Sequence, residues 1–488
     1  MKHYLAIDLG AESGRAILGS LDDNKLVLEE LHRFPNTPVR TPSGLYWDTL
    51  RLFHEMQQGL AVVGRERKVK LDGIGVDTWG VDFGLLGRDG SLVANPMHYR
   101  DARNDGMLEK TFAAVPREEI FAQTGIQFMQ LNTLCQLYAM KLAGAPALEV
   151  ADKLLLIPDL FNYWLTGVQR AELTFASTTQ FYNPIKKRWA TELLDSLGLP
   201  SRILPEIVYP GTLLGPLLPH VAEAAGIEQF PVYATASHDT AAAVAAVPAE
   251  GDDWCYISSG TWSLMGLELA EPVINAQSLA LNVTNEIGYG GSVRFLKNIA
   301  GLWVLQESRR AWAQEGTEYS YEELARLAGA ATPFKAVIDP DQFLAPGQMV
   351  ARIAAYCRST GQAVPESAGE FARTILEGLA LRYRQVLEGL ESAAARKIKV
   401  IHIVGGGSRN QLLNQLVADA TGRLVVAGPA EGTAAGNILV QAIGSGALSG
   451  LAEARSVLRN SSSLSLVEPK PAAGWDDAYA KFCKLTAK

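Results

Sequence analysis

Small and polar residues follow an apolar segment at several places in the chain, and this pattern is typical of loops that hold phosphate. The first such loop runs from Asp8 to Arg15 and contains Gly10, Ser13 and Gly14. Glycines allow backbone N–H groups to converge on an anion, and an arginine adds a fixed positive charge. Asp8 could hold Mg²⁺ through water, because that ion keeps most of its water ligands. The alternative is an ordinary glycine-containing hairpin with a surface arginine.

Two further loops have the same character. Ser258-Ser259-Gly260-Thr261 joins two apolar segments, and Gly405-Gly406-Gly407 follows a third. Three successive glycines cost about 0.5–1 kcal/mol each relative to alanine, and we expect no packing use for them. Bare backbone would accept the flat surface of adenine or ribose. A simple hairpin turn and a tight strand-to-helix turn are the respective alternatives.

A carboxylate stands among small residues in Ala236-Ser237-His238-Asp239-Thr240-Ala241-Ala242-Ala243. Asp239 lies where a small-residue helix would begin, a position that stabilises a negative charge. It is a candidate general base, whereas the alternative is a helix cap beside a structural histidine. Asp77 to Phe83, Tyr99-Arg100-Asp101 and Asn298 combine carboxylates, aromatic rings and amides suited to a polyol. Solvated strand ends are the alternative for all three.

The elements that would position these residues occur twice. Residues 4–7 and 16–19 predict one hairpin, and residues 254–257 and 262–265 predict another. This repetition predicts two domains of similar plan, with a boundary in the Pro/Gly/acidic segment 247–253. Later, a strand over 400–404 precedes a helix from about Asn410 to Thr421 that Gly422 ends. Ser367 and Glu370 predict a capping box before a long helix.

Composition restricts the class of protein. The 488 residues carry a formal net charge of −8, and 48% of them are hydrophobic. This balance is typical of a globular chain that binds neither nucleic acid nor a membrane surface. We expect a cytoplasmic location, free thiols at the four cysteines, and no signal peptide. The sequence contains no P-loop motif, no protein-kinase motif set and no dinucleotide-binding glycine fingerprint after the first strand.

Taken together, the loops resemble those of the FGGY carbohydrate kinases, within the actin-like ATPase superfamily, from about residue 4 to about residue 445. The stretches that carry the resemblance are 77–83, 99–101, 124–128, 236–240, 258–266 and 296–303. The resemblance implies an α/β fold with two ribonuclease-H-like domains and an interdomain catalytic cleft. The implied domains are 1–246, with the sugar side and the first phosphate loop, and 247–450, with the nucleotide side. Residues 451–488 are expected to form a tail that packs on the domains.

The resemblance also implies residue roles. Asp239 would be the general base, and the sugar would contact Gly80, His238, Thr240 and Asn298. ATP would contact Ala11, Glu12, Ser13, Gly14, Arg15, Thr261, Gln306 and Gly406, with Mg²⁺ near Asp8. The implied reaction is phosphorylation of L-rhamnulose at its 1-hydroxyl by ATP, without an obligate protein partner. The alternatives are a kinase for fuculose, xylulose or glycerol and, less favoured, an actin-like or chaperone-like ATPase.

Overall fold

The computed structural model describes residues 1–471 and 473–487, which form two compact units. Unit 1 comprises residues 1–248, 268–295 and 432–461, and unit 2 comprises residues 249–267, 296–431 and 462–488. The chain first leaves unit 1 inside the predicted boundary segment. The units are not two continuous halves, however, because two later segments return to unit 1.

Unit 1 is built on a six-stranded sheet with the order β13-β14-β6-β1-β2-β3. Strand β1 (Lys2–Leu9) pairs antiparallel with β2 (Ser13–Asp22), which confirms the predicted first hairpin. On its other side β1 runs parallel to β6 (Gly73–Thr78), and β6 runs parallel to β14 (Pro231–Ala234). The carboxyl ends of these three parallel strands therefore lie at one edge of the sheet.

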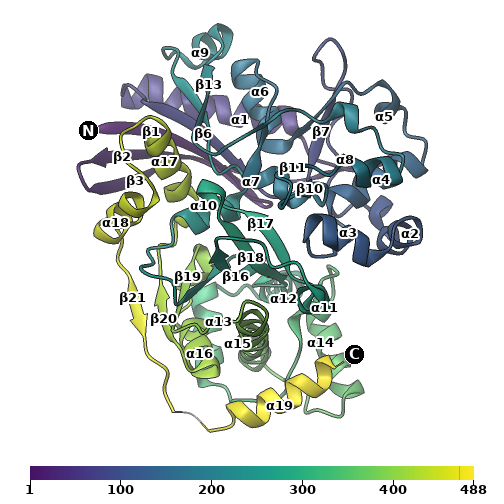
Figure 1. The fold of residues 1–488 in the computed structure, drawn as a ribbon. Coiled ribbons are helices and arrows are strands. Elements are labelled where there is room, and N and C mark those ends of the chain that lie inside the picture. Colours follow the sequence, from purple (N-terminus) through teal and green to yellow (C-terminus); the bar gives the residue numbers. More distant parts are fainter. Residues whose placement is uncertain (472, 488) are drawn as a thin grey trace. The chain divides into compact units, whose positions relative to one another are not determined.

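Both faces of β1 are buried in the middle of this sheet, which explains why Tyr4, Leu5, Ala6 and Ile7 are apolar in succession. Leu5, Ile7 and Leu9 pack in one cluster with residues of α1 (Thr49–Val62) and α6 (Ile157–Thr166). The alternate residues Tyr4 and Ala6 pack in a second cluster with α17 (Gly432–Gly444) and α18 (Leu451–Ser461). Figure 1 shows α17 beside β1 and β2 although more than 400 residues separate them in the sequence.

Unit 2 repeats the same strand plan. Strand β15 (Trp254–Ser259) pairs antiparallel with β16 (Ser263–Leu269), which confirms the second predicted hairpin. Strand β15 also runs parallel to β19 (Val400–Val404), and β19 runs parallel to β20 (Leu424–Ala427). In both units an antiparallel strand forms the edge of the sheet next to the last parallel strand. This edge strand is β13 beside β14 in unit 1 and β21 (Ser465–Val467) beside β20 in unit 2. The two-domain α/β class predicted from the sequence is thus confirmed.

The remaining elements complete the two units. The other strands of unit 1 are β3 (Lys25–Pro35), β4 (Val39–Thr41), β5 (Gly44–Tyr46), β7 (Phe83–Leu86), β8 (Lys153–Leu156), β9 (Ala171–Glu172), β10 (Tyr182–Asn183), β11 (Arg188–Trp189), β12 (Ile207–Val208), β13 (Thr212–Pro216) and β17 (Thr284–Ile287). Its other helices are α2 (Met107–Ala114), α3 (Arg117–Thr124), α4 (Thr133–Leu142), α5 (Pro146–Val150), α7 (Leu173–Ala176), α8 (Thr191–Ser196), α9 (Pro219–Ala225), α10 (Asp239–Ala245) and α11 (Ala276–Leu281). Unit 2 contains α12 (Trp303–Gln314), α13 (Tyr321–Ala330), α14 (Met349–Ser359), α15 (Ala368–Ala393), α16 (Gln411–Thr421) and α19 (Trp475–Thr486). Strand β18 (Val293–Ile299) begins in unit 1 and ends in unit 2.

Two local predictions can be compared with the helix ends. Gly422 ends α16 in the left-handed conformation, as the sequence predicts, and Asn410, near which the helix was expected to begin, is its N-cap residue. At α15 only half of the predicted capping box forms: the Ser367 hydroxyl accepts from the N–H of Glu370. The Glu370 carboxylate instead accepts from Lys335 and from the N–H of Glu366, because the lysine offers a charged donor.

Two wider expectations concern thiols and membranes. All four cysteines are free thiols, as expected. Across residues 1–471 and 473–487, no helix has the length and apolar character needed to span a bilayer.

Candidate active site

The parallel strands of unit 1 place several predicted site residues at one edge of its sheet. Asp8 at the end of β1 is the register partner of Asp77 at the end of β6. After β14 the backbone continues beside β6. There the N–H of Thr78 donates to the Ser237 carbonyl at 2.9 Å, and His238 forms an isolated parallel β-bridge with Thr78. Asp239 comes next and begins α10. Carboxylates far apart in the sequence are therefore brought together by strand register alone.

The loop after β1 differs from the predicted phosphate nest in its glycines. Gly14 does not adopt a positive φ, and glycine is required there because a Cβ would lie 2.3 Å from the Phe34 ring. Asn36 holds the loop by donating its side-chain amide to the Gly10 carbonyl at 2.9 Å. Ala11 and Ser13 are half-buried and Glu12 is exposed. Asn36 thus fixes the loop, whose residues 11–13 remain at least partly exposed.

Arg15 and Asp8 form an ion pair, with Nη2 and Oδ2 separated by 2.5 Å. Asp77 beside them is fully buried, and its Oδ2 accepts from the Asn437 amide at 2.6 Å. Burial and the neighbouring Asp8 hold the pKa of Asp77 well above its ordinary 3.8. The edge of the sheet thus gathers two carboxyl groups, of which Asp8 is paired with Arg15 and Asp77 resists ionisation.

Asp239 keeps one carboxylate oxygen available. Its Oδ1 accepts from the N–H of Thr240 at 2.5 Å and from the Thr240 hydroxyl at 3.1 Å. The side chain is 31% exposed, and its Oδ2 makes no hydrogen bond to the residues that the structure describes. Burial raises the pKa of Asp239 above 3.8, His238 acts in the opposite direction, and Asp8 adds to the rise. The helix cap considered as an alternative role is wrong: the N-cap residue of α10 is His238, Asp239 is the first residue of the helix, and no described side chain makes a capping hydrogen bond there.

Gly80 lies beside the imidazole of His238. A Cβ at Gly80 would lie 3.1 Å from Nε2 of His238, so glycine gives the imidazole room. The next residue, Val81, has φ +73°, which is unfavourable for a β-branched side chain. Thr133 holds that backbone by donating its hydroxyl to the Val81 carbonyl at 2.7 Å. Strain of this kind persists where surrounding contacts enforce a functional geometry.

The predicted nucleotide residues of unit 2 lie at the corresponding edge of its sheet. Thr261 follows β15 and Gly406 follows β19, and these strands run parallel with Ser258 opposite Val404. The turn after β15 holds α12, because the Thr261 carbonyl accepts from the N–H of Trp303 at 3.0 Å. Gln306 lies in the first turn of α12, and its buried Oε1 has no hydrogen-bond partner among the residues described. Asn298 lies half-buried near the end of β18.

The expectation that the three successive glycines have no packing use is wrong for two of them. A Cβ at Gly405 would lie 2.9 Å from the Ser259 carbonyl oxygen, and one at Gly407 would lie 2.0 Å from the Ser259 hydroxyl. Both glycines allow β19 and its turn to approach β15. A Cβ at Gly406 would meet nothing within 4 Å. Only Gly406 therefore offers bare backbone that local packing does not explain.

Two carboxylates in the segments suited to a polyol, Asp82 and Asp101, accept hydrogen bonds from within the protein. Asp82 is fully buried and accepts from the indole N–H of Trp47 at 2.6 Å and of Trp79 at 2.9 Å. Burial raises its pKa to about 6. Asp101 accepts from the backbone N–H groups of Leu45 and Arg103. Asp82 therefore braces Trp79 beside Gly80, whereas Asp101 braces the backbone at Leu45 and Arg103, and both carboxylates are engaged in internal hydrogen bonds.

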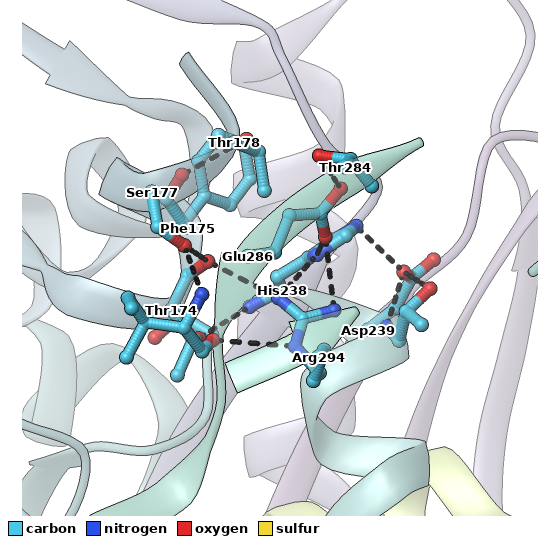
Figure 2. Close-up of polar contacts among 12 residues, drawn as sticks. Thr174, Phe175, Ser177, Thr178, His238, Asp239, Thr284, Glu286 and Arg294 are labelled. Carbon is cyan, nitrogen blue, oxygen red and sulfur yellow. Dashed lines mark hydrogen bonds and ion pairs between the residues drawn. The ribbon is translucent and has the colours of Figure 1, made fainter. Parts of the chain in front are cut away.

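Several supporting residues were missed by sequence reasoning. Arg294, Glu286 and Thr174 surround His238 (Figure 2), and Asn437 supports Asp77. All come from segments distant in the sequence from the residue they contact. The one sequence signal for such a supporting residue was a polar residue within an apolar helix, as at Asn437 and Gln441.

Comparison with known proteins defines the class. Residues 3–246 match the FGGY family of carbohydrate kinases, N-terminal domain, and residues 255–445 match the C-terminal domain of the same family. The chain belongs to the FGGY family of carbohydrate kinases. It is therefore a phosphotransferase, and the resemblance inferred from its loops is confirmed.

The relatives are more specific. The chain is 45% identical to a rhamnulokinase from Bacteroides thetaiotaomicron over 99% of both chains. It is 42% identical to a rhamnulokinase from Enterococcus faecalis, covering 96% of this chain and 94% of the relative. Among solved structures, a ligand-bound xylulose kinase from Lactobacillus acidophilus superposes with a TM-score of 0.83 at 17% identity, covering 99% of this chain and 98% of that one. At 17% identity, the similarity to the xylulose kinase shows a shared fold alone.

Proposed function

We propose that the chain transfers the γ-phosphoryl group of ATP to the 1-hydroxyl of L-rhamnulose. The observation that carries the proposal is the full-length similarity to rhamnulokinases at 45% identity, together with an available carboxylate oxygen on Asp239. A kinase for another ketose or polyol is the alternative, favoured only by the shared fold of a xylulose kinase. A cytoplasmic location is part of the same proposal.

In the proposed mechanism Asp239 accepts the hydroxyl proton through Oδ2. Phosphoryl transfer has a loose transition state, so the proton leaves late and the protein acts mainly through positioning and charge. Gly80, His238, Thr240 and Asn298 are proposed to position the sugar. The loop Ala11–Arg15 and the residues Thr261, Gln306 and Gly406 are proposed to bind ATP.

Mg²⁺ fits this site only as an ion bound through water. Within residues 1–471 and 473–487, no three His, Cys, Asp or Glu side chains are grouped to hold a metal directly. Asp8 retains a second oxygen beside its ion pair with Arg15, which suits a water ligand of an ion carried by the triphosphate. When bound, Mg²⁺ would neutralise charge on the phosphoryl oxygens.

The function is tested by ADP release from the purified protein with a panel of ketoses and polyols. We expect L-rhamnulose to give the highest kcat/KM, with little ATP turnover in the absence of a sugar. NMR of the product would place the phosphate on the 1-oxygen. A higher kcat/KM for xylulose, fuculose or glycerol would refute the proposed substrate, and equal turnover without any sugar would refute the kinase reaction.

Gly406→Val tests the nucleotide side. The added side chain enters open space, so we expect an unchanged melting temperature and a KM for ATP raised about tenfold, which corresponds to about 1.4 kcal/mol. The KM for the sugar should not change. Gly407→Ala is the matched control, because its Cβ meets the Ser259 hydroxyl and should lower stability by about 1–3 kcal/mol. An unaltered KM for ATP in Gly406→Val would remove Gly406 from the ATP site.

A further inference from the structure

A guanidinium is completely buried beside the proposed base. Arg294 on β18 has no exposed surface, and its Nη1 lies 3.0 Å from Oε2 of Glu286 on β17. Its Nε donates to the Ile287 carbonyl at 3.2 Å, and its Nη2 donates to the Thr174 carbonyl at 3.4 Å. Although burial opposes it, Arg294 lowers the pKa of Glu286. A buried charge retained with this many partners has a defined orientation.

The same guanidinium contacts His238. Nη2 lies 3.2 Å from Nδ1 of the imidazole (Figure 2). A guanidinium carries only donors, so Nδ1 must accept and the neutral ring carries its proton on Nε2. Nε2 lies 3.4 Å from Oδ1 of Asp239. The N–H of His238 is thereby directed at the carboxylate.

Glu286 offers a competing arrangement. Its Oε2 lies 3.5 Å from Nδ1 of His238, and a proton on Nδ1 could donate to it. That contact is an ion-pair distance only, whereas Nη2 of Arg294 is hydrogen-bonded to Nδ1 at 3.2 Å. Oε2 also forms an ion pair with Nη1 of Arg294 at 3.0 Å, although neither of these two atoms has a hydrogen-bond partner among the residues described. The geometry therefore favours Arg294 as the partner of Nδ1.

The backbone of His238 is held from the same side. Its N–H donates to the Thr174 hydroxyl at 3.4 Å, and that hydroxyl donates to Oε2 of Glu172 at 2.5 Å. The N–H of Ser237 donates to the same carboxylate oxygen at 3.1 Å. Because both the ring and the backbone are held, rotation of the imidazole is restricted.

We propose that Arg294 is a positioning residue that holds His238 with its proton on Nε2 and so directs that N–H at Oδ1 of Asp239. Oδ1 then receives two hydrogen bonds from Thr240 and faces the His238 N–H at an Nε2–Oδ1 distance of 3.4 Å, which leaves Oδ2 as the basic atom for the acceptor hydroxyl. The inference deepens the proposed function and rests on Asp239 as its base. The position of the proton, however, can be measured without turnover.

The first experiment observes the ring nitrogens of His238 by NMR in protein labelled with ¹⁵N-histidine. The chain has seven histidines, and the spectrum of His238→Gln assigns the signals. We expect a protonated Nε2 and an unprotonated Nδ1 at neutral pH. A proton on Nδ1, or on both nitrogens, would overturn the proposal, whatever the substrate of the enzyme proves to be.

The second experiment uses Arg294→Met/Glu286→Gln, which removes both charges so that neither is left buried alone. We expect a mixture of tautomers and a kcat lowered about tenfold to a hundredfold, with an unchanged KM for ATP. Arg373→Met/Glu377→Gln is the matched control, because this α15 ion pair is also largely buried, with exposed fractions of 13% and 2%, and contacts no residue assigned to a ligand. An unchanged tautomer and kcat in the first double variant would refute the role of Arg294. If that variant does not fold, the wild-type spectrum alone decides.

Discussion

Asp239→Asn is expected to lower kcat for sugar phosphorylation by about a hundredfold to ten-thousandfold, the range for loss of a general base. The amide keeps the shape of the carboxylate but cannot take the hydroxyl proton at Oδ2. ATP affinity should be unchanged, because the proposed nucleotide residues do not include Asp239. Initial rates of ADP release and a separate ATP titration measure the two quantities. Full activity of Asp239→Asn would remove this residue as the base.

The pH dependence of the wild-type enzyme provides a control for the same residue. A base must be ionised to act, and burial raises the pKa of Asp239 above 3.8. The acid limb of the kcat/KM profile for the sugar is therefore expected above pH 3.8, with activity lost as pH falls through it. Circular dichroism at each pH separates this loss from unfolding. An acid limb at or below the ordinary value would show that burial does not control the ionisation.

Gly436→Ala is expected to destabilise the protein by about 3 kcal/mol, in the upper part of the range for overpacking. A Cβ at Gly436 in α17 would lie 1.8 Å from the carbonyl oxygen of Ala242 in α10, and backbone cannot move aside like a side chain. Since α10 begins at Asp239, we also expect a lower kcat in the fraction that folds. Denaturant titration and initial rates measure the two effects.

Gly450→Ala is the matched control for that prediction. It lies in the same returning segment, and a Cβ there would meet nothing within 4 Å. Its stability and kcat should equal those of the wild type. Equal stability of Gly436→Ala and Gly450→Ala would show that the two helices can separate without cost.

Local patterns predicted the elements well. Both hairpins, the strand over 400–404 and the end of α16 at Gly422 follow from apolar patterning and glycine placement, which depend on near neighbours in the sequence. The packing role of Gly405 and Gly407 could not be predicted, because it arises from Ser259 on a strand nearly 150 residues earlier. The same reason hid the function of Asp82, whose partners Trp47 and Gln136 come from separate segments.

The candidate site was predicted from polar residues that differ in character from their neighbours in the sequence. Asp239 and His238 stand out among alanines, whereas Arg294 and Glu286 lie in short strands where a charged residue usually indicates a solvated face. Only the three-dimensional arrangement shows that Arg294 is fully buried. Long-range polar support around a reactive group is therefore the part of the site that a single sequence reveals least.

The return of residues 432–461 to unit 1 has a consequence for biosynthesis. A growing polypeptide that has released only its first 248 residues still lacks the helix that covers one face of β1 and the amide that binds Asp77. We therefore expect the amino-terminal portion to remain incompletely folded and dependent on chaperones during synthesis. It should complete its fold only after residues 432–461 have been translated. A gene fragment that encodes residues 1–248 alone should yield insoluble product, and co-expression of the missing segment should rescue it.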